Sequence, residues 1–330
     1  MSEQKVSKRF AVIGAGIAGL VCAHALKKAG HEVVVFEKSR GVGGRLSSKR
    51  LPNSTGLDMG TTAFQASNSA FIEWLESFTE ATLWRPQQAL WLAGEGFRLV
   101  GGKSFWVGVP KMNAFLKELS ADLDIRTSQR VIELESERRY ITPITDTESL
   151  GNFDACVLAV PAEQAKVLLN QSPALQAYAN AANAEPCWSL AISTRMPCYQ
   201  PFDWLDLTGH SSLRRLVRVS SKPGAEHDTE VWVAQTHRRW SREHLEQTPE
   251  EVSALIIPEV AKLIGVSPAA MESLHVHRWR YAEHISSAEA PAYYDERRRV
   301  AICGDWLKGN SVEAAWQSGL YCARSILATL

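Results

Sequence analysis

The chain has 330 residues, of which 45% are hydrophobic and 22% are charged, a balance typical of a folded globular protein and unlike that of a disordered one. Lys and Arg together number 36, as do Asp and Glu, so no net charge attracts the chain to nucleic acid or to an anionic membrane. Because no run of about 18 apolar residues occurs either, we expect a soluble, cytoplasmic protein without nucleic-acid or membrane partners.

The N-terminal segment predicts a strand, a turn, a helix and a second strand. The short apolar run Phe10–Ile13 precedes a glycine-rich turn at 14–19. Residues 20–29 then have the composition of a helix that ends at Gly30, and residues 31–37 are rich in β-branched side chains. Together they form a complete βαβ unit, the element on which nucleotide-binding α/β folds are built.

The turn of this unit has the spacing G-x-G-x-x-G that binds a dinucleotide. The first glycine permits the tight turn, the second lets a pyrophosphate approach the backbone, and the third lets helix and strand pack closely, while the N–H groups of the helix N-terminus face the phosphates. Glu37 ends the second strand, where its carboxylate can accept from both ribose hydroxyls and would repel the extra phosphate of NADP. A fortuitous glycine-rich turn is the alternative. We assign cofactor contacts in the turn to Gly14, Gly16, Ile17, Ala18 and Gly19.

A second glycine-rich segment follows directly, over residues 39–45. Gly44 lies in it, and Arg45 is placed to set its guanidinium on the pyrophosphate. Two phosphate-binding loops around one strand, with Lys38 between them, suit a long, buried FAD better than an exchangeable NAD. A flexible surface loop is the alternative interpretation of this segment.

The middle of the chain mixes helices with a growing share of strands. Helices are predicted over residues 70–80, 111–119, 162–171 and 249–265, the last in spite of Pro258. Hairpin strands are predicted within 88–107 around the turn at 94–96, and further strands over 130–134, 155–160, 189–196, 215–221, 230–236 and 275–282. The run of strands from about 165 to 285 indicates a β-rich domain inserted into the nucleotide-binding fold.

The C-terminal segment returns to the pattern of the N-terminus. A strand over 300–305 leads into Asp305 and Trp306, and a helix starts near Val312. The carboxylate of Asp305 can accept from a ribityl chain, and the helix from Val312 would direct its N–H groups at the N1/O2 edge of a flavin. For Asp305 the simpler interpretation is a helix N-cap.

The histidines and cysteines do not predict a metal centre. His275 and His277 alternate along one strand and so share a face, but no third ligand is evident, and structural histidines are the favoured interpretation. The cysteines include no C-x-x-C pair and are expected to be reduced thiols of the core, namely Cys22, Cys156, Cys187, Cys198, Cys303 and Cys322.

Several motifs together resemble the flavin amine oxidase superfamily: GAGIAG with Glu37, GVGGR, VIELE, CVLAVP, and the terminal CGDW with VEAAWQSG. The compact length and the order of the motifs are most similar to the renalase branch, including its bacterial members. The resemblance implies an α/β fold, an FAD-binding Rossmann domain of GR2 type with an inserted β-rich substrate domain. The FAD domain is then expected over residues 1–68, 100–165 and 280–330, and the substrate domain over 69–99 and 166–279.

The same resemblance implies further cofactor contacts and an activity. The backbone of Val131 would hold the adenine, and the loop with Met59, Gly60 and Thr61 would pass beside the flavin ring. We expect the FAD to be bound non-covalently. Renalase-like enzymes oxidise the 2- and 6-dihydro isomers of NAD(P)H to NAD(P)+, with hydride passing to FAD and O2 being reduced to hydrogen peroxide. The implied partners are a dihydronicotinamide dinucleotide and O2.

The sequence identifies no catalytic residue. Hydride transfer from a dihydropyridine needs no general base, because the donor becomes aromatic as it loses hydride. The chain differs from the family at two positions. Where it has Thr62, family members tend to have a Tyr that follows a polar residue, and where it has Gln235 they tend to have a His. The alternative functions are an FAD oxidase of amines or another small metabolite, a dehydrogenase with another electron acceptor, and a non-enzymatic flavin-binding protein. Candidate pocket residues, with packing as the alternative for both tryptophans, are Thr62, Gln235, Trp279 and Trp306.

Overall fold

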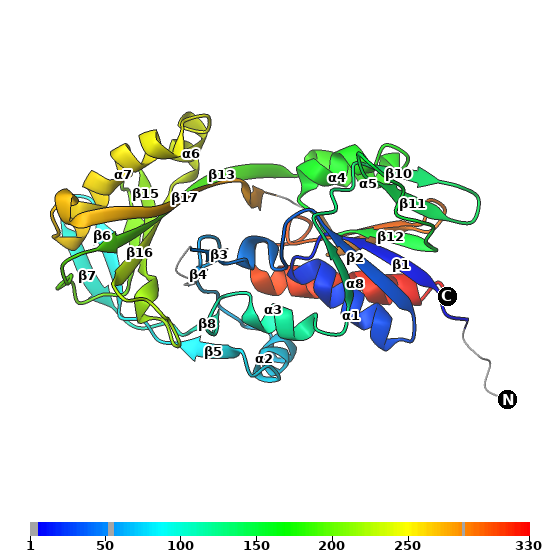
Figure 1. The fold of residues 1–330 in the computed structure, drawn as a ribbon, viewed down its shortest axis with the longest axis horizontal. Helices are drawn as coiled ribbons and strands as arrows, with labels where there is room; N and C mark the ends of the chain where they lie inside the picture. The colour runs from blue at the N-terminus through cyan, green and yellow to red at the C-terminus, as the bar shows by residue number, and fades with distance from the viewer. Residues whose placement is uncertain (1–5, 52–55, 286–287) are drawn as a thin grey trace. The chain divides into compact units, whose positions relative to one another are not determined.

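The computed structural model of the protein describes residues 6–51, 56–285 and 288–330 (Figure 1). The chain folds into two compact units, each assembled from separate segments. Unit 1 consists of Met1–Gly44, Leu116–Ala184 and His284–Leu330, and unit 2 of Arg45–Phe115 and Glu185–Glu283. Residues 45–68, 100–115 and 280–283 therefore belong to unit 2, although we expected them in the FAD domain. Residues 166–184, which we expected in the substrate domain, belong to unit 1. The assignment of FAD and substrate to particular domains stays a prediction.

Unit 1 is built on a six-stranded sheet in the order β18-β19-β12-β1-β2-β9. Its strands run parallel except for β18, which is antiparallel to β19 at one edge. The inner strands are continuous apolar runs because both faces of the sheet are covered. The strands are β1 (Arg9–Ile13), β2 (Glu32–Glu37), β9 (Asp124–Thr127), β12 (Ala155–Leu158), β18 (Ala292–Asp295) and β19 (Val300–Cys303).

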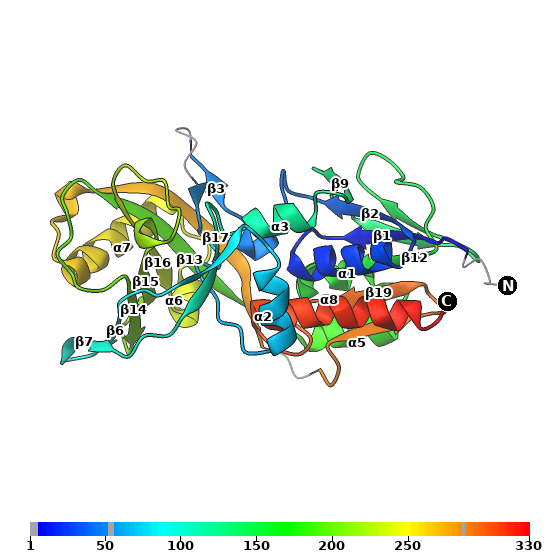
Figure 2. The same cartoon turned by 90° about the horizontal axis from the view of Figure 1, so that it is seen from below.

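Helices α1 (Ile17–Lys28) and α8 (Val312–Leu327) lie side by side on one face of this sheet (Figures 1 and 2). A Cβ added to Gly319 would lie 2.3 Å from the carbonyl oxygen of Ala18, so the close approach of the two helices requires glycine. The opposite face shares a hydrophobic core with α4 (Ala162–Leu168), α5 (Pro173–Ala181) and the hairpin of β10 (Glu133–Ser136) and β11 (Ile141–Ile144). The sheet is thus a middle layer, which leaves its strand ends free for a ligand.

Unit 2 is built on a seven-stranded sheet in the order β17-β13-β16-β15-β14-β6-β7. Its strands are β6 (Gln88–Leu92), β7 (Gly96–Val100), β13 (Asn183–Thr194), β14 (Trp204–Thr208), β15 (Leu213–Arg218), β16 (Glu230–Thr236) and β17 (Met271–Ile285). Other elements of the described residues are β3 (Lys49–Arg50), β4 (Gly56–Leu57), α2 (Ser69–Glu76), β5 (Ala81–Trp84), β8 (Phe105–Gly108), α3 (Ala114–Leu119) and α6 (Arg238–Glu243).

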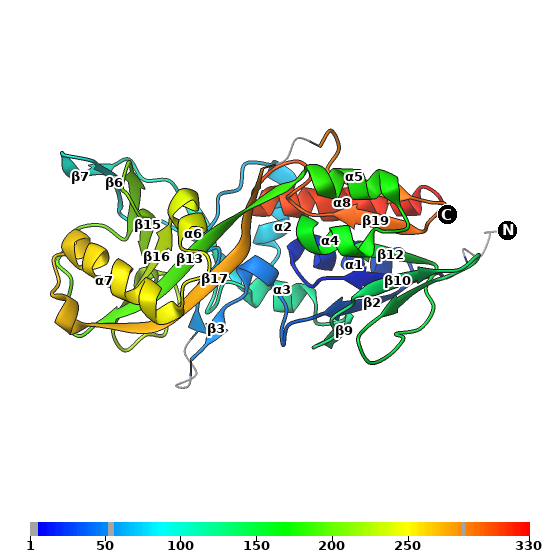
Figure 3. The same ribbon diagram turned by 90° about the horizontal axis from the view of Figure 1, so that it is seen from above.

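Helix α7 (Pro249–Ile264) covers one face of the sheet of unit 2 (Figure 3). Thr248 and Glu251 form a capping box at its start, and Gly265 ends it in the left-handed conformation with φ of 72°. The helix continues through Pro258, as predicted. The side chains that it buries against the sheet recur at helical spacing: Val252, Ile256, Val260 and Ile264.

Some predicted boundaries are wrong for local reasons. The strand predicted over 130–134 begins only at Glu133, because Ser128 has φ of 59° and the N–H of Gln129 donates to the carbonyl oxygen of Glu37 (2.9 Å), which holds this stretch in an irregular connection. The strand predicted over 215–221 ends at Arg218, where a 3-10 turn (Val219–Ser221) follows. Helix α1 already begins at Ile17, so the turn predicted at 14–19 includes the first helical residues.

The hairpin predicted around residues 94–96 is confirmed, since β6 and β7 pair antiparallel with Leu92 opposite Gly96. Helices α2 and α3 confirm two further predictions with shorter bounds, and α4 confirms a third. Among the described residues, no helix combines the length and the apolar character needed to span a membrane.

Candidate functional site

The glycine turn of unit 1 uses its glycines in two different ways. Gly14 has φ of 107°, and a Cβ there would lie 2.5 Å from the carbonyl oxygen of Ala159. A Cβ on Gly19 would lie 2.0 Å from the carbonyl oxygen of Gly14, so this glycine allows α1 to pack against the end of β1. At Gly16, by contrast, an added Cβ would meet nothing within 4 Å. Gly14 and Gly19 are therefore required by packing, whereas Gly16 keeps the backbone open to a ligand.

The start of α1 offers backbone donors above this open glycine. Gly16 is its N-cap, no side chain caps it, and its first turn contains no acidic residue. Ile17 and Ala18 occupy the first helical positions, where N–H groups have no partner within the helix. Uncapped N–H groups together with the positive end of the helix dipole form a ready site for a phosphate.

Both carboxylate oxygens of Glu37 accept hydrogen bonds from the backbone. It lies at the end of β2 and is 7% exposed. Its Oε2 accepts from the N–H of Ala15 (2.9 Å) and its Oε1 from the N–H of Ser39 (2.7 Å), so the carboxylate connects the two glycine-rich segments. Next to it, burial lowers the pKa of Lys38, with the negative charge of Glu37 opposing this change and the positive charge of Arg130 adding to it.

The second glycine-rich segment touches the first. The N–H of Gly43 donates to the carbonyl oxygen of Ala15 (2.8 Å). Gly44 has φ of 55°, and a Cβ there would come within 3.3 Å of the Cα of Gly16. The segment is thus bound to the nucleotide turn by backbone contacts, which argues against the alternative of an independent surface loop.

Asp305 lies just beyond the end of β19 and is 4% exposed. The N-cap of α8 is Ser311, whose side chain accepts from the N–H of Ala314 (3.0 Å), and Val312 is the first residue of the helix. The alternative interpretation of Asp305 as the cap of this helix is therefore wrong. Between them, Trp306 is buried in the core of unit 1 and its indole donates to the carbonyl oxygen of Val160 (3.0 Å). This favours packing over a pocket role for Trp306.

Val131 is buried in the same core and precedes β10 instead of starting it. The N–H of Gln129, two residues before it, donates to the carbonyl oxygen of Glu37 (2.9 Å), so the structure brings Val131 near the end of β2. Unit 1 thus holds two glycine segments, a buried carboxylate and a second strand end with Asp305 on one Rossmann-like sheet.

The other predicted cofactor residues belong to unit 2, where they form a tight backbone turn. We call Met59, Gly60 and Thr61 the Met59–Thr61 turn. The N–H of Thr61 donates to the carbonyl oxygen of Arg45 (2.9 Å), and a Cβ on Gly60 would lie 2.1 Å from that same oxygen. The guanidinium of Arg45 donates to the carbonyl oxygen of Ala282 (3.0 Å).

Two predicted pocket residues hold this turn from the sheet of unit 2. The Nε2 of Gln235 donates to the carbonyl oxygen of Gly60 (2.7 Å), and the indole of Trp279 donates to the carbonyl oxygen of Met59 (3.1 Å). Thr62 follows the turn and is buried. The structure thus brings Gln235, Trp279 and Thr62 together, although they come from distant parts of the sequence.

A buried ion pair next to the turn was not predicted from the sequence. Lys222 and Asp58 form a salt bridge in which the side chains are 5% and 9% exposed. Asp58 also accepts from Ser48 and from the N–H of Met112 (3.1 Å). Lys222 follows a 3-10 turn in a polar stretch whose composition is typical of the protein surface. The only available signal for the ion pair was Asp58, the carboxylate that precedes the Met59–Thr61 turn.

The histidines of β17 lie near the same turn. The ring of His277 contacts Trp279 edge to face, with centroids 4.3 Å apart, and lies 6.2 Å from the ring of His275. Burial, with help from the positive charges of His275 and Lys49, lowers the pKa of His277 to about 4. Across the described ranges, no three His, Cys, Asp or Glu side chains are arranged to hold a metal ion.

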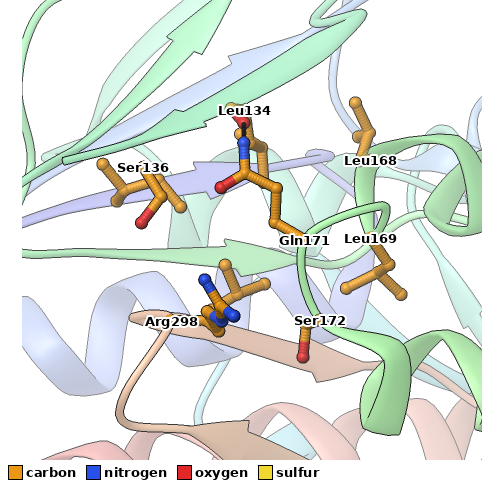
Figure 4. Close-up of a pocket in the computed structure, with 9 residues that line it drawn as sticks. Leu134, Ser136, Leu168, Leu169, Gln171, Ser172 and Arg298 are labelled. Carbon is orange, nitrogen blue, oxygen red and sulfur yellow. Dashed lines mark hydrogen bonds between the residues drawn. The ribbon is translucent and has the colours of Figure 1, made fainter.

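One small hollow in unit 1 is lined by none of the predicted site residues; Figure 4 shows its lining. Gln171 donates to the carbonyl oxygen of Leu134 (3.2 Å) and Ser172 to Asp295 (2.6 Å), so these polar groups already have protein partners. The hollow belongs to the packing of the β10–β11 hairpin against α4 and β19. Its lining residues are Leu134, Ser136, Ile141, Leu168, Leu169, Gln171, Ser172, Arg298 and Val300.

The fold and the glycine segments define a Rossmann-type oxidoreductase, and comparisons with known proteins give the family. Residues 12–78 match the model of the NAD(P)-binding Rossmann-like domain, and residues 78–327 match that of the flavin containing amine oxidoreductases. Because the second match covers most of the chain, the protein belongs to the flavin containing amine oxidoreductase family. This confirms the predicted fold class, the enzyme class of oxidoreductases and a flavin cofactor.

Individual relatives match over limited segments or at low identity. The flavin-containing monooxygenase FMO GS-OX1 of Arabidopsis thaliana is 48% identical over 56 residues, which are 17% of this chain and 12% of that protein. A 4,4'-diapophytoene desaturase of Staphylococcus aureus is 46% identical over 54 residues, 16% of this chain and 11% of that protein. The matches therefore span only a small part of these relatives.

Solved structures match over nearly the whole chain. Cyclohexylamine oxidase from Brevibacterium oxydans superposes with a TM-score of 0.77 at 12% identity, covering 98% of this chain and 99% of that one. An oxidoreductase from Methanosarcina mazei superposes with a TM-score of 0.73 at 14% identity, covering 97% and 100%. At such identities the likeness concerns the fold alone.

Proposed function

We propose that the chain is an FAD-dependent oxidase of the renalase-like branch, which oxidises 2- and 6-dihydro isomers of NAD(P)H to NAD(P)+ and reduces O2 to hydrogen peroxide. The observation that carries the proposal is the junction of the two glycine segments, in which Glu37 binds Ala15 and Ser39 while Gly43 binds Ala15. One carboxylate and two backbone loops would then contact the same stretch of a bound FAD.

The residues of unit 1 fit the adenosine and pyrophosphate parts of FAD. The open space at Gly16 and the uncapped start of α1 suit a pyrophosphate, and the buried Glu37 suits the ribose hydroxyls. Gly14, Gly19 and Gly44 shape the turn, Ile17 and Ala18 supply N–H groups, and Lys38 flanks the carboxylate. Val131 would bind the adenine through its backbone.

The flavin end would be held by other residues. Asp305 would accept from the ribityl chain, and α8 from Val312 would direct N–H groups toward the ring. The Met59–Thr61 turn would pass beside the ring, with Arg45 at the pyrophosphate. In the bound state the flavin supplies a two-electron acceptor that can take a hydride and pass the electrons to O2.

The main contribution of the protein to the proposed reaction is to position the substrate against the flavin. Gln235 and Trp279 fix the carbonyl groups of the Met59–Thr61 turn, which sets where a planar substrate can lie. The groups that hold the turn are an amide and an indole, neither of which is a base at neutral pH. This suits a dihydropyridine, whose hydride transfer requires no proton removal.

The alternative is an FAD oxidase of amines or another small metabolite. Its support is that the matched folds include cyclohexylamine oxidase and a putrescine oxidase bound to putrescine. An amine oxidase would be reduced by primary amines and would be inert toward dihydronicotinamide isomers.

The deciding experiment is anaerobic stopped-flow of the FAD-loaded protein with dihydro-NAD isomers made by borohydride reduction, followed by flavin absorbance. We expect rapid bleaching by the 2- or 6-dihydro isomer and none by ordinary NADH, which serves as the matched control. Bleaching by benzylamine or putrescine instead would establish the alternative. If no isomer bleaches the flavin, the proposed substrate is wrong.

We further propose that the FAD is non-covalent. All six cysteines are buried and reduced, and the thiols of Cys22, Cys303 and Cys322 hydrogen-bond among themselves within the core of unit 1. Precipitation of the yellow protein with acid should leave the colour in the supernatant. Colour that stays with the pellet through washing in denaturant would contradict this proposal.

A further inference from the structure

The face of β17 that carries His275, His277 and Trp279 is distinct from the face that packs on the core. Val276, between the two histidines, packs against the core that α7 seals, and the guanidinium of Arg278 lies 5.5 Å from the ring of Trp188 in that same core. Because side chains alternate along a strand, His275, His277 and Trp279 point away from α7. We call these three side chains the His–Trp ladder.

The ladder leads directly to the turn that is expected beside the flavin. Its rings are spaced 6.2 Å and 4.3 Å apart in sequence order, and its last member donates to the carbonyl oxygen of Met59 (3.1 Å). A Cβ on Gly60 would lie 3.0 Å from the ring of Trp279. The half-buried rings of His275, His277 and Trp279 therefore form a continuous wall that ends at the Met59–Thr61 turn.

The electrostatic character of this wall follows from its two imidazole rings and from the cation that acts on them. Burial is the main cause that lowers the pKa of both imidazoles, to about 4 for His277, and it therefore favours the neutral form of both rings. The charged side chain that acts on both is the cation Lys49 of β3. A cationic ligand placed on the ladder would meet the hydrogen-bonding groups of the imidazole and indole rings and would be repelled by the ammonium group of Lys49.

The carboxylate of β17 that shares the ladder's face by alternation, Glu283, already has cationic partners. Glu283 binds Arg214 and lies 4.0 Å from Arg238. Arg278 and Arg280, on the other face of the strand, both bind Glu246. Within the described part of the chain, the ladder itself therefore offers no carboxylate to an ammonium group. The π faces alone would attract a cation, but Lys49 opposes this attraction.

We propose that the His–Trp ladder, together with Lys49, is the specificity wall of the substrate pocket, and that it admits planar neutral or anionic reductants and rejects protonated amines. This rests on the proposed function, since it places the substrate at the Met59–Thr61 turn. A dihydronicotinamide dinucleotide has both required features, a planar uncharged ring and a polyanionic remainder. The neutral imidazole of His277 can donate to or accept from an amide on that ring.

The test uses two aromatic probes of equal size and opposite charge, benzoate and benzylamine. Binding to the FAD-loaded protein is measured by titration calorimetry at pH 7.5 under anaerobic conditions. We expect the wild-type protein to bind benzoate at least tenfold more tightly than benzylamine. His277→Glu should lower this ratio by at least tenfold, because it places a carboxylate on the ladder, and Lys49→Ala should lower it several-fold.

The matched control is His277→Gln, which keeps a neutral hydrogen-bonding side chain and should preserve the ratio within threefold. Flavin content and thermal midpoint are recorded for every variant, so that a misfolded protein is recognised. The proposal is overturned if the wild-type protein prefers benzylamine, if it binds neither probe, or if His277→Glu leaves the ratio unchanged. If benzoate is preferred but no dihydro isomer bleaches the flavin, the proposed function fails while the charge selectivity of the ladder stands.

Discussion

Replacing Glu37 by Gln tests the cofactor site at its most constrained point. The carboxylate accepts two backbone N–H bonds, from Ala15 (2.9 Å) and Ser39 (2.7 Å), and is 7% exposed. Glutamine keeps the shape but has a single acceptor oxygen, so one buried N–H group would face the NH2 of the new side chain. The substitution therefore disturbs the loop junction and weakens the acceptor offered to the ribose at the same time.

The size of the effect follows from the bonds that change. Leaving a buried N–H unsatisfied costs about 1–3 kcal/mol, and a hydrogen bond to a charged acceptor contributes roughly 1 kcal/mol more than one to a neutral acceptor. If about 2 kcal/mol of this appears in cofactor binding, the dissociation constant of FAD rises about 30-fold. The measurement is a titration of the apoprotein with FAD, followed by quenching of flavin fluorescence.

The matched control is Glu32→Gln on the same strand. Glu32 begins β2 and forms an ion pair with Arg9 (2.6 Å) whose side chains are 58% and 35% exposed. A surface ion pair contributes little, so FAD affinity should change less than threefold. The reasoning is refuted if Glu37→Gln binds FAD within threefold of the wild-type protein, or if the control loses as much affinity as Glu37→Gln does.

Two further predictions concern the Met59–Thr61 turn and its support. Gly60→Ala should destabilise the protein by about 3 kcal/mol, because the new Cβ would lie 2.1 Å from the carbonyl oxygen of Arg45, which is backbone and cannot turn aside. Gly41→Ala, where a Cβ meets nothing within 4 Å, is the control, and equal urea midpoints for the two would contradict the argument. Lys222→Met should cost about 3–5 kcal/mol by leaving Asp58 buried without its cation, and adding Asp58→Asn should recover most of this loss. A double variant as unstable as the sum of the two single variants would show that charge burial is not the cause.

The nucleotide turn could be predicted from sequence because its requirements are local. A positive φ at Gly14 and a close approach at Gly19 can be met by glycine and by hardly any other residue, so the backbone geometry leaves a trace in the sequence. The strands on either side are short apolar runs, which fixes the order of the elements. The boundaries of the elements were less predictable. The strand β10, for example, begins only at Glu133, because the N–H of Gln129 donates to the carbonyl oxygen of Glu37 and keeps the preceding residues irregular.

The support of the Met59–Thr61 turn could not be predicted in this way. The pair of Asp58 and Lys222 joins residues 164 positions apart, and no local pattern distinguishes such a lysine from one on the surface. Trp279 and Trp306 illustrate the same limit. Both were candidates for the pocket on equal grounds, yet one binds the turn of unit 2 and the other fills the core of unit 1.

Gln235 shows how a departure from the family's pattern can preserve a structural role. Its amide donates to the carbonyl oxygen of Gly60 (2.7 Å) and accepts from the guanidinium of Arg214 (3.3 Å), so one side chain joins the turn to β16 and to the irregular start of β15. A histidine, which the resembling family tends to have at this position, could also donate and accept, but it would change charge near neutral pH. With an amide here, the support of the Met59–Thr61 turn does not titrate. Burial likewise lowers the pKa of His277, which contacts Trp279 beside the same turn, to about 4, so the groups proposed to position a substrate keep the same hydrogen-bonding character across the physiological pH range.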